Sequence, residues 1–189
     1  MKKIKSLFKR DYENTRLVYN EVVEGSEWVL NGEGTPTRKF DGSCCAIING
    51  EIYKRYDAKK GKKIPEGAIP CQDYDPITGH QPCWLKCDEN KPEDKYFIEG
   101  FKNYLSSSVG CSSDLDGTYE LCGEKVQGNP EKIKGHQLIK HGCQILLNVP
   151  RDFEGIKEYL KDKDIEGIVW HRDNGDMVKI KKKDFGFKR

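Results

Sequence analysis

The chain has 189 residues, in which 33 Lys and Arg side chains nearly balance 31 Asp and Glu side chains. This length is sufficient for one domain with a sizeable core and short for a multi-domain enzyme, so we expect a single domain over residues 1–189. No stretch reaches membrane-spanning length and the basic N-terminus lacks the apolar run of a secretion signal, which excludes a membrane-spanning or secreted class and predicts a soluble, cytoplasmic protein.

The first predicted element is a hairpin between residues 44–48 and 52–56, because Asn49-Gly50 is a strong signal for a tight turn between strands. Residues 59–91 are rich in Gly, Pro and Asp and predict a long ordered loop. Residues 92–105 predict a helix that begins at a proline and buries one face in the core. The residues expected on that face are Phe97, Phe101, Tyr104 and Leu105.

The alternating residues 118–122 predict a strand, followed by a turn at Gly128-Asn129-Pro130. The continuous apolar run 143–149 predicts a buried strand. Asp152 is expected to cap a helix over residues 153–161, whose apolar residues recur at helical spacing.

The last predicted elements are strands at residues 167–171 and 177–181, joined by the turn 173–176. Antiparallel strands with intervening helices predict an α+β domain. Beyond Lys179 basic residues outnumber the single acid Asp184, which suits a polyanion such as a nucleoside triphosphate or RNA; a solvated tail is the alternative.

The cysteines are an even eight, spread along the chain without a compact disulfide spacing. We therefore expect reduced thiols. Cys71, His80, Cys83 and Cys87 are near one another in sequence, but their spacing fits no common zinc site, so zinc is the weaker alternative.

Lys39-Phe40-Asp41-Gly42 places a lysine beside a carboxylate and a glycine turn. With Glu166 and the pair Lys179 and Lys181 downstream, it predicts a lysine nucleophile that captures a nucleotide; a surface lysine is the alternative for Lys39 alone. A nucleophilic lysine must be neutral, and lowering its pKa from about 10.4 to about 7 requires about 4 kcal/mol. Neighbouring cations and a metal supply this by penalising the ammonium form.

Lys179 and Lys181 are two residues apart on a predicted strand, so their side chains share a face and both are expected to reach one triphosphate. A solvent-facing Lys-x-Lys strand would have the same pattern. Phosphoryl transfer also requires charge compensation, usually by Mg²⁺ held by carboxylates and water. Asp41, Glu120 and Glu166 are the candidate ligands, directly or through water. For Glu166, which has apolar neighbours, a salt bridge at a sheet edge is the alternative.

These motifs resemble the covalent nucleotidyltransferase superfamily of ATP-dependent DNA and RNA ligases and mRNA-capping enzymes. The similarity is greater to a small ATP-dependent RNA ligase family that includes the vertebrate 5′-to-3′ RNA ligase, and it spans residues 28–187. The segments that carry it are 28–30, 38–45, 118–121, 128–130, 141–142 and 165–171.

The resemblance implies an antiparallel-sheet nucleotidyltransferase domain. DNA ligases and capping enzymes append an OB-fold, but only a few residues follow Lys183 here, so we expect none. It implies that Lys39 is adenylated, that Glu120 contacts the ribose or a metal-bound water, and that Glu166 helps to hold the metal. Lys179 and Lys181 would contact the α-phosphate. The implied cofactors are ATP as AMP donor and Mg²⁺, with Mn²⁺ as an alternative.

Two arginines complete the expected nucleotide-binding set. Arg55 lies where such ligases place an arginine after the nucleophile strand; an ordinary exposed arginine is the alternative. Arg38 stands where several relatives have an acid, so their adenine recognition does not transfer to this chain. His141 and His171 lie inside matching segments, and packing roles compete with substrate contact for both.

The function expected from the resemblance is that of an ATP-dependent RNA ligase. Lys39 takes AMP from ATP, AMP passes to an RNA 5′-phosphate, and an RNA 3′-hydroxyl displaces it. DNA ligation and GTP-dependent guanylyl transfer are alternatives within the superfamily. A non-catalytic RNA-binding module is the alternative from another class, and it predicts salt-sensitive binding.

Overall fold

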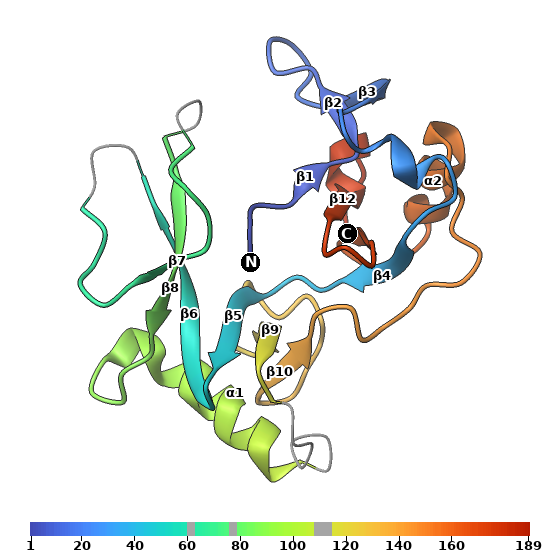
Figure 1. Ribbon diagram of the computed structural model, residues 1–189. Helices are drawn as coiled ribbons and strands as arrows, with labels where there is room; N and C mark the ends of the chain where they lie inside the picture. Colours follow the sequence, from blue (N-terminus) through green and yellow to red (C-terminus); the bar gives the residue numbers. More distant parts are fainter. Residues whose placement is uncertain (60–62, 76–78, 108–114) are drawn as a thin grey trace. The chain divides into compact units, whose positions relative to one another are not determined.

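The computed structural model describes residues 1–59, 63–75, 79–107 and 115–189 (Figure 1). They form two compact units: unit 1 comprises residues 1–3 and 41–141, and unit 2 comprises residues 4–40 and 142–189. Largely antiparallel sheets with few helices agree with the predicted α+β class. A single nucleotidyltransferase domain stays a prediction. Within these ranges, no helix combines the length and apolar character needed to cross a bilayer.

Unit 1 contains a six-stranded antiparallel sheet in the order β10-β9-β5-β6-β8-β7. Its elements are β5 (Ser43–Ile48), β6 (Glu51–Ala58), β7 (Ile69–Pro70), β8 (Gln81–Lys86), η2 (Pro92–Asp94), α1 (Lys95–Ser106), β9 (Gly117–Gly123) and β10 (His136–Lys140).

The predicted hairpin is confirmed as β5 and β6. Asn49 and Gly50 both have positive φ, 51° and 74°, as a two-residue hairpin turn requires. The predicted loop 59–91 is wrong where β7 and β8 form. Residues 81–86 pair with β6 although they include Pro82, and β7 pairs with β8 in turn. Residues 60–62 and 76–78 of that loop lie outside the described residues.

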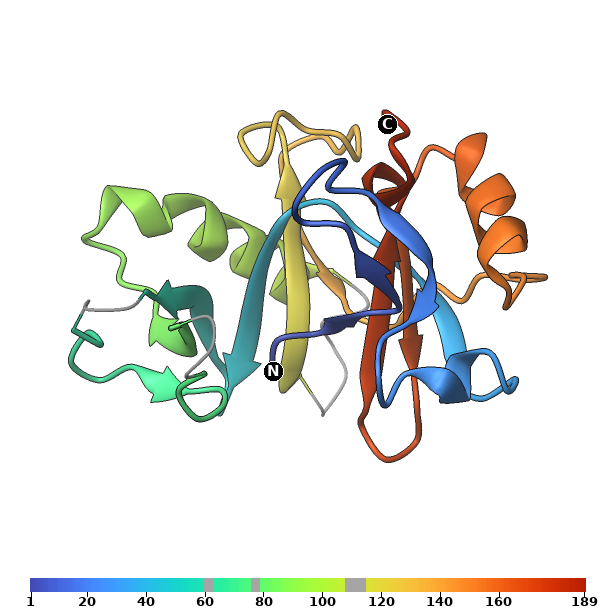
Figure 2. The same ribbon diagram turned by 90° about the horizontal axis from the view of Figure 1, so that it is seen from above.

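The predicted helix is confirmed as η2 followed by α1, which packs against β10 and β6 (Figure 2). Phe97, Phe101 and Tyr104 pack against the buried cluster of this unit, as predicted. Leu105 does not, because it is 40% exposed. The strand expected at residues 118–122 is confirmed as β9, whereas its partner β10 was missed because its sequence, HQLIK, alternates weakly.

Unit 2 contains a four-stranded sheet in the order β1-β12-β11-β4, parallel only between β1 and β12, and a separate two-stranded sheet of β2 and β3. Its elements are β1 (Lys5–Ser6), β2 (Phe8–Arg10), β3 (Val18–Val22), η1 (Glu27–Val29), β4 (Thr35–Lys39), α2 (Phe153–Lys161), β11 (Gly167–His171), β12 (Met177–Lys181) and η4 (Lys182–Phe185).

The helix expected at residues 153–161 is confirmed as α2, with the Asp152 side chain accepting a hydrogen bond from the Gly155 N–H at 2.8 Å. Ile156 and Leu160 are fully buried in the core cluster that also contains Trp170. The predicted strands at 167–171 and 177–181 are confirmed as β11 and β12. This core therefore supports the four-stranded sheet of unit 2, whose strands carry the candidate site residues.

The buried strand expected at residues 143–149 is wrong. This segment makes one isolated bridge to β4, between Ile145 and Thr37, and Asn148 then adopts a positive φ of 55°. Ile145 and Leu147 are 58% and 76% exposed. A continuous apolar run does not by itself reveal whether both faces are covered, and here they are not.

We expect Gly167→Ala to destabilise unit 2 strongly. An added Cβ would lie 2.1 Å from the Ile180 carbonyl oxygen, so β11 and β12 would have to separate. Gly175→Ala is the matched control, because nothing surrounds that position and only its φ of 87° opposes a side chain, at a cost of about 1 kcal/mol. Urea unfolding should show a clearly larger loss for Gly167→Ala; equal losses would contradict this packing.

Candidate active site

The pairing of three strands in unit 2 brings the predicted lysines to one end of its sheet. Gly167 in β11 lies opposite Lys39 in β4 on one side and opposite Lys181 in β12 on the other. Because Gly167 has no side chain, the β12 backbone at Ile180 and Lys181 can pack closely against it. Glu166 directly precedes Gly167 and is only 9% exposed.

One carboxylate pairs with both lysines. Glu166 Oε2 lies 2.5 Å from Lys39 Nζ, and Glu166 Oε1 accepts a hydrogen bond from Lys181 Nζ. The side chains of Lys39, Glu166 and Lys181 are 18%, 10% and 22% exposed, so all three are largely shielded from solvent. The structure therefore brings these three predicted residues together.

Lys179 shares a face of β12 with Lys181 and lies opposite Val169 of β11. Burial, followed by repulsion from Lys181 and Lys39, lowers the pKa of Lys179 to about 8. Burial raises the pKa of Glu166, but Lys39 and Lys181 outweigh it, so the net shift is downward. Three lysines around one glutamate leave an excess of positive charge that suits a phosphate group.

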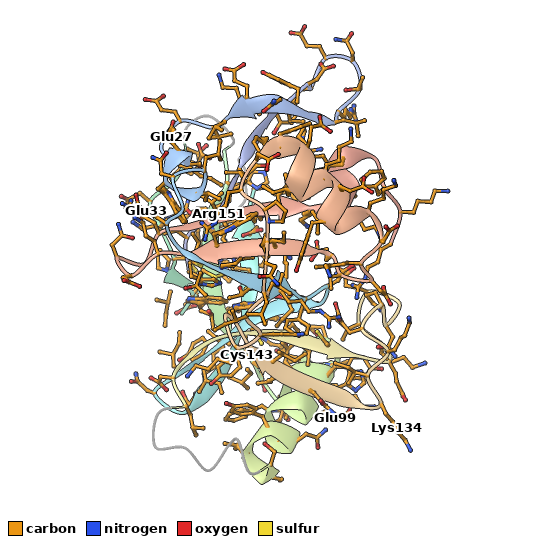
Figure 3. All side chains as sticks on the ribbon, turned by 90° about the vertical axis from the view of Figure 1, so that its right-hand side faces the viewer. Glu27, Glu33, Glu99, Lys134, Cys143 and Arg151 are labelled. Atoms are coloured by element: carbon orange, nitrogen blue, oxygen red, sulfur yellow. The ribbon has the colours of Figure 1, made fainter. Side chains whose placement is uncertain are left out.

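Arg151 anchors the segment that leads into β4 (Figure 3). Its guanidinium donates hydrogen bonds to the carbonyl oxygens of Val29 at 3.1 Å, Gly34 at 2.9 Å, and Glu33. The sequence analysis missed this residue, because no local pattern marks an arginine that binds carbonyl groups more than a hundred positions away. Arg151 thereby helps to place the strand that ends at Lys39.

Thr37, two residues before Lys39, was also missed. Its hydroxyl donates to the Val169 carbonyl at 3.1 Å and, having one proton, accepts from His171 Nε2 at 3.0 Å. His171 thus joins β11 to β4. Of the two alternatives for this histidine, a packing role and a contact with substrate, this hydrogen bond agrees with the packing role. The spacing of Thr37 and Lys39 was the sequence signal that could have revealed Thr37, since residues two apart on a strand share a face.

Arg38 projects from the opposite face of β4 to Lys39, as alternation requires. Its guanidinium carbon lies 4.8 Å from the ring centroid of Phe40, and its backbone N–H donates to the Gln144 carbonyl at 2.8 Å. The structure therefore does not group Arg38 with the lysines around Glu166. Its role in nucleotide binding stays a prediction.

Glu120 belongs to unit 1, where β9 presents it to two partners. Its Oε1 accepts from the Gly42 N–H at 3.1 Å, and its Oε2 lies 2.9 Å from His141 Nε2. The Asp41 N–H donates to Glu131 Oε1 at 2.8 Å, a contact that the sequence did not predict. No ligand role for Asp41 or Glu120 is tested by these contacts.

Arg55, also in unit 1, donates to Asp57 Oδ1 at 3.0 Å and to the Met1 carbonyl at 2.6 Å. Its guanidinium carbon lies 5.6 Å from the ring of Trp84. The alternative of an ordinary exposed arginine is therefore wrong, since its side chain is 15% exposed. Phosphate contact by Arg55 stays a prediction.

The remaining candidates are the zinc alternative and the basic end. In the part of the chain that the structure describes, Cys71, His80, Cys83 and Cys87 form no common cluster of ligand atoms. In the basic segment, Lys182 is buried and donates to the Lys163 carbonyl at 2.9 Å. The prediction that the basic residues of this segment bind a polyanion is thus wrong for Lys182, because this lysine is buried and stabilises the fold.

A family model described as RNA ligase 1 matches residues 77–189 of this chain. Curated relatives include the RNA ligase 1 of Danio rerio, which is 34% identical over 95% of this chain and 76% of that protein. The RNA ligase 1 of Pongo abelii is 24% identical over 94% of this chain and 75% of that protein. With the family model covering more than half of its length, the chain belongs to the RNA ligase 1 family.

Proposed function

We propose that this chain is an ATP-dependent RNA ligase that joins RNA 5′-phosphate and 3′-hydroxyl ends through a Lys39–AMP intermediate in a nucleotidyltransferase fold. Membership in the RNA ligase 1 family supports RNA joining. The observation that carries the mechanism is the Glu166 carboxylate, paired with both Lys39 and Lys181 beside the half-buried Lys179.

In the first step the neutral Lys39 Nζ attacks the α-phosphorus of ATP. A P–N bond forms, the bond from the α-phosphorus to the bridging oxygen breaks, pyrophosphate leaves, and one amine proton passes to water. Glu166 orients the amine before attack, since it lies 2.5 Å from Lys39 Nζ. Lys179 and Lys181 supply positive charge for the α-phosphate, where charge-assisted contacts are strong.

In the second step an RNA 5′-phosphate oxygen attacks the same phosphorus. The P–N bond breaks, a phosphoanhydride joins AMP to the RNA end, and Lys39 regains its proton. In the third step an RNA 3′-hydroxyl attacks the phosphorus of the RNA 5′-phosphate. A phosphodiester bond forms, AMP leaves, and the hydroxyl proton is released.

Mg²⁺ prefers carboxylate oxygens and retains several waters. Both Glu166 oxygens contact lysines, so Glu166 fits a metal held through water better than one held directly. When bound, Mg²⁺ or Mn²⁺ would neutralise charge on the phosphates and the leaving pyrophosphate. Asp41 and Glu120 as further ligands belong to this proposal, as does Arg38 as a nucleotide contact. Arg55 belongs to it as a phosphate or RNA-end contact through the family resemblance.

The test is incubation with ATP labelled at the α-phosphate. Wild-type protein should take up label and Lys39→Ala should take up none. Lys86→Ala is the matched control, because Lys86 also ends a strand and pairs with a glutamate, Glu51, at 2.6 Å. Label on Lys39→Ala, or no label on the wild type, would remove the proposal.

The rival activities give different results in the same assay. A guanylyltransferase would lose the ATP label when unlabelled GTP is added, and a DNA ligase would seal DNA ends in preference to RNA ends. A non-catalytic RNA-binding module would show salt-sensitive RNA binding that Glu166→Gln leaves unchanged, and no label at all. The proposed ligase should keep its label in GTP and join RNA.

A further inference from the structure

We propose that unit 1 binds a divalent transition metal of the Zn²⁺ class through Cys44, Glu120 and His141. A sulfur, a carboxylate oxygen and an imidazole nitrogen from these side chains all lie within 4.8 Å of one another. Glu120 is buried, while Cys44 and His141 are half-buried, which leaves the group open to an entering ion. The contacts that define this site are independent of the proposed ligase activity, although Glu120 also belongs to the proposed nucleotide site.

The backbone fixes the three side chains. Antiparallel pairing of β5 and β9 places Cys44 directly opposite Glu120. His141 follows β10, and its N–H donates to the Thr118 carbonyl at 3.0 Å. Thr118 and Glu120 share a face of β9 because they are two residues apart. The ligands thus come from adjacent, hydrogen-bonded strands of one sheet.

Hydrogen bonds also orient the imidazole ring. His141 Nε2 lies 2.9 Å from Glu120 Oε2, and Nδ1 lies 2.9 Å from the Thr118 hydroxyl oxygen. An ionised carboxylate only accepts, so Nε2 carries a proton in the metal-free state. When a metal binds Nε2, that proton would move to Nδ1, and Nδ1–H would then donate to Thr118, the outer contact that metal-bound histidines usually have.

The donor set selects the kind of metal. Thiolate and imidazole favour Zn²⁺ and similar ions, whereas Mg²⁺ and Mn²⁺ favour oxygen ligands alone. Tetrahedral Zn²⁺ with bonds of about 2.0–2.3 Å places its ligand atoms roughly 3.5 Å apart. The present separations lie from 2.9 Å between His141 and Glu120 up to the 4.8 Å limit, so small side-chain shifts suffice.

Three protein ligands leave a fourth position for water. Binding releases the thiol proton of Cys44, whereas the proton of His141 moves from Nε2 to Nδ1, so affinity should rise with pH through the thiol. The Glu120 oxygen that accepts from the Gly42 N–H stays anchored, which limits the carboxylate's movement. The donors around Glu120 therefore fit a softer ion than the Mg²⁺ expected there from the family resemblance.

Titration of the reduced, metal-free full chain with Co²⁺ tests the site. We expect one equivalent to produce a thiolate-to-cobalt charge-transfer band, and Zn²⁺ to abolish the band by displacement. Cys44→Ser should lose the band, and His141→Gln should weaken Co²⁺ binding at least tenfold. Cys143→Ser is the control, because Cys143, which Figure 3 labels, is exposed and is not a member of the cluster.

Absence of the band in the wild type, or its persistence in Cys44→Ser, would overturn the proposal. Circular dichroism checks that each variant is folded. Should Cys44→Ser unfold, Thr118→Val decides, because it keeps all three ligands and removes only the hydroxyl that holds His141 Nδ1. Weakening of about tenfold supports the site, and unchanged affinity contradicts it. Co²⁺ binding is measured without ATP or RNA, so a variant that no longer transfers AMP still gives a valid result.

Discussion

Glu166→Gln should lower the free energy of unfolding by about 3 kcal/mol and abolish transfer of AMP to the protein. The substitution leaves Lys39 and Lys181 without their shared counter-charge, close to the cation of Lys179. The expected loss lies at the low end for a broken buried ion pair, because the lysine side chains keep about a fifth of their exposure. Urea unfolding and α-label uptake measure the two effects.

Glu51→Gln is the matched control for this variant. Glu51 also pairs with a lysine, Lys86, but both side chains are about half exposed. Such a surface pair contributes less than about 1 kcal/mol. Equal losses for Glu51→Gln and Glu166→Gln, or normal labelling of Glu166→Gln, would contradict the assigned role of Glu166.

The same carboxylate predicts a pH dependence. The folded-state pKa of Glu166 is lowered from 4.5, since its lysine partners outweigh the effect of burial. Its contribution to stability is therefore complete above the unfolded-state pKa and is lost as the pH falls through the folded-state value. Acid titration of the unfolding free energy should be steeper in the wild type than in Glu166→Gln; identical curves would exclude this contribution.

Lys179→Met should have opposite effects on stability and activity. Because burial and repulsion from Lys181 and Lys39 lower the pKa of Lys179 to about 8, its ammonium form destabilises the fold at pH 7. An apolar side chain of similar length should raise the free energy of unfolding by about 2 kcal/mol. Label uptake should fall at least a hundredfold, because the proposed contact with the α-phosphate would be lost.

The pH dependence of stability distinguishes removal of the Lys179 ammonium group from improved packing as the cause of the gain. Between about pH 8 and 10.5 the unfolded chain binds more protons at this position than the folded protein, so wild-type stability rises through that window. The gain from Lys179→Met should therefore be complete below pH 8 and shrink towards pH 10.5. Lys157→Met, at an exposed lysine, is the control. A gain that is independent of pH, or a loss, would contradict the account.

The sequence indicated which residues lie together around Glu166, but it did not predict β4, the strand that ends at Lys39. Lys39, Glu166 and Lys181 were expected to meet, and alternation placed Lys179 beside Lys181. The strand β4 was not predicted, because Thr35–Lys39 is short and contains a proline. Only its pairing with β11 makes it a strand, and that pairing joins residues about 130 positions apart.

Tertiary contacts decided the elements that the sequence predicted wrongly. The run 143–149 has the composition of a buried strand, yet Leu147 is exposed, and among the described residues the run is joined to β4 by an isolated bridge at Ile145. The Gly- and Pro-rich residues 59–91 predicted a loop, but β6 provides an edge along which β8 pairs. Glu131, which accepts from the Asp41 N–H, lies in a turn without any pattern that marks it. Local patterns carry no information about such partners.

The position of the AMP group tests the central claim most directly, because Lys39 and Lys179 are both amines and Lys179 has a pKa of about 8. Wild-type protein is incubated with ATP, digested under conditions that preserve the P–N bond, and its peptides are sequenced by mass spectrometry. The account predicts AMP on Lys39 alone. AMP on Lys179, or on no lysine of the chain, would contradict it.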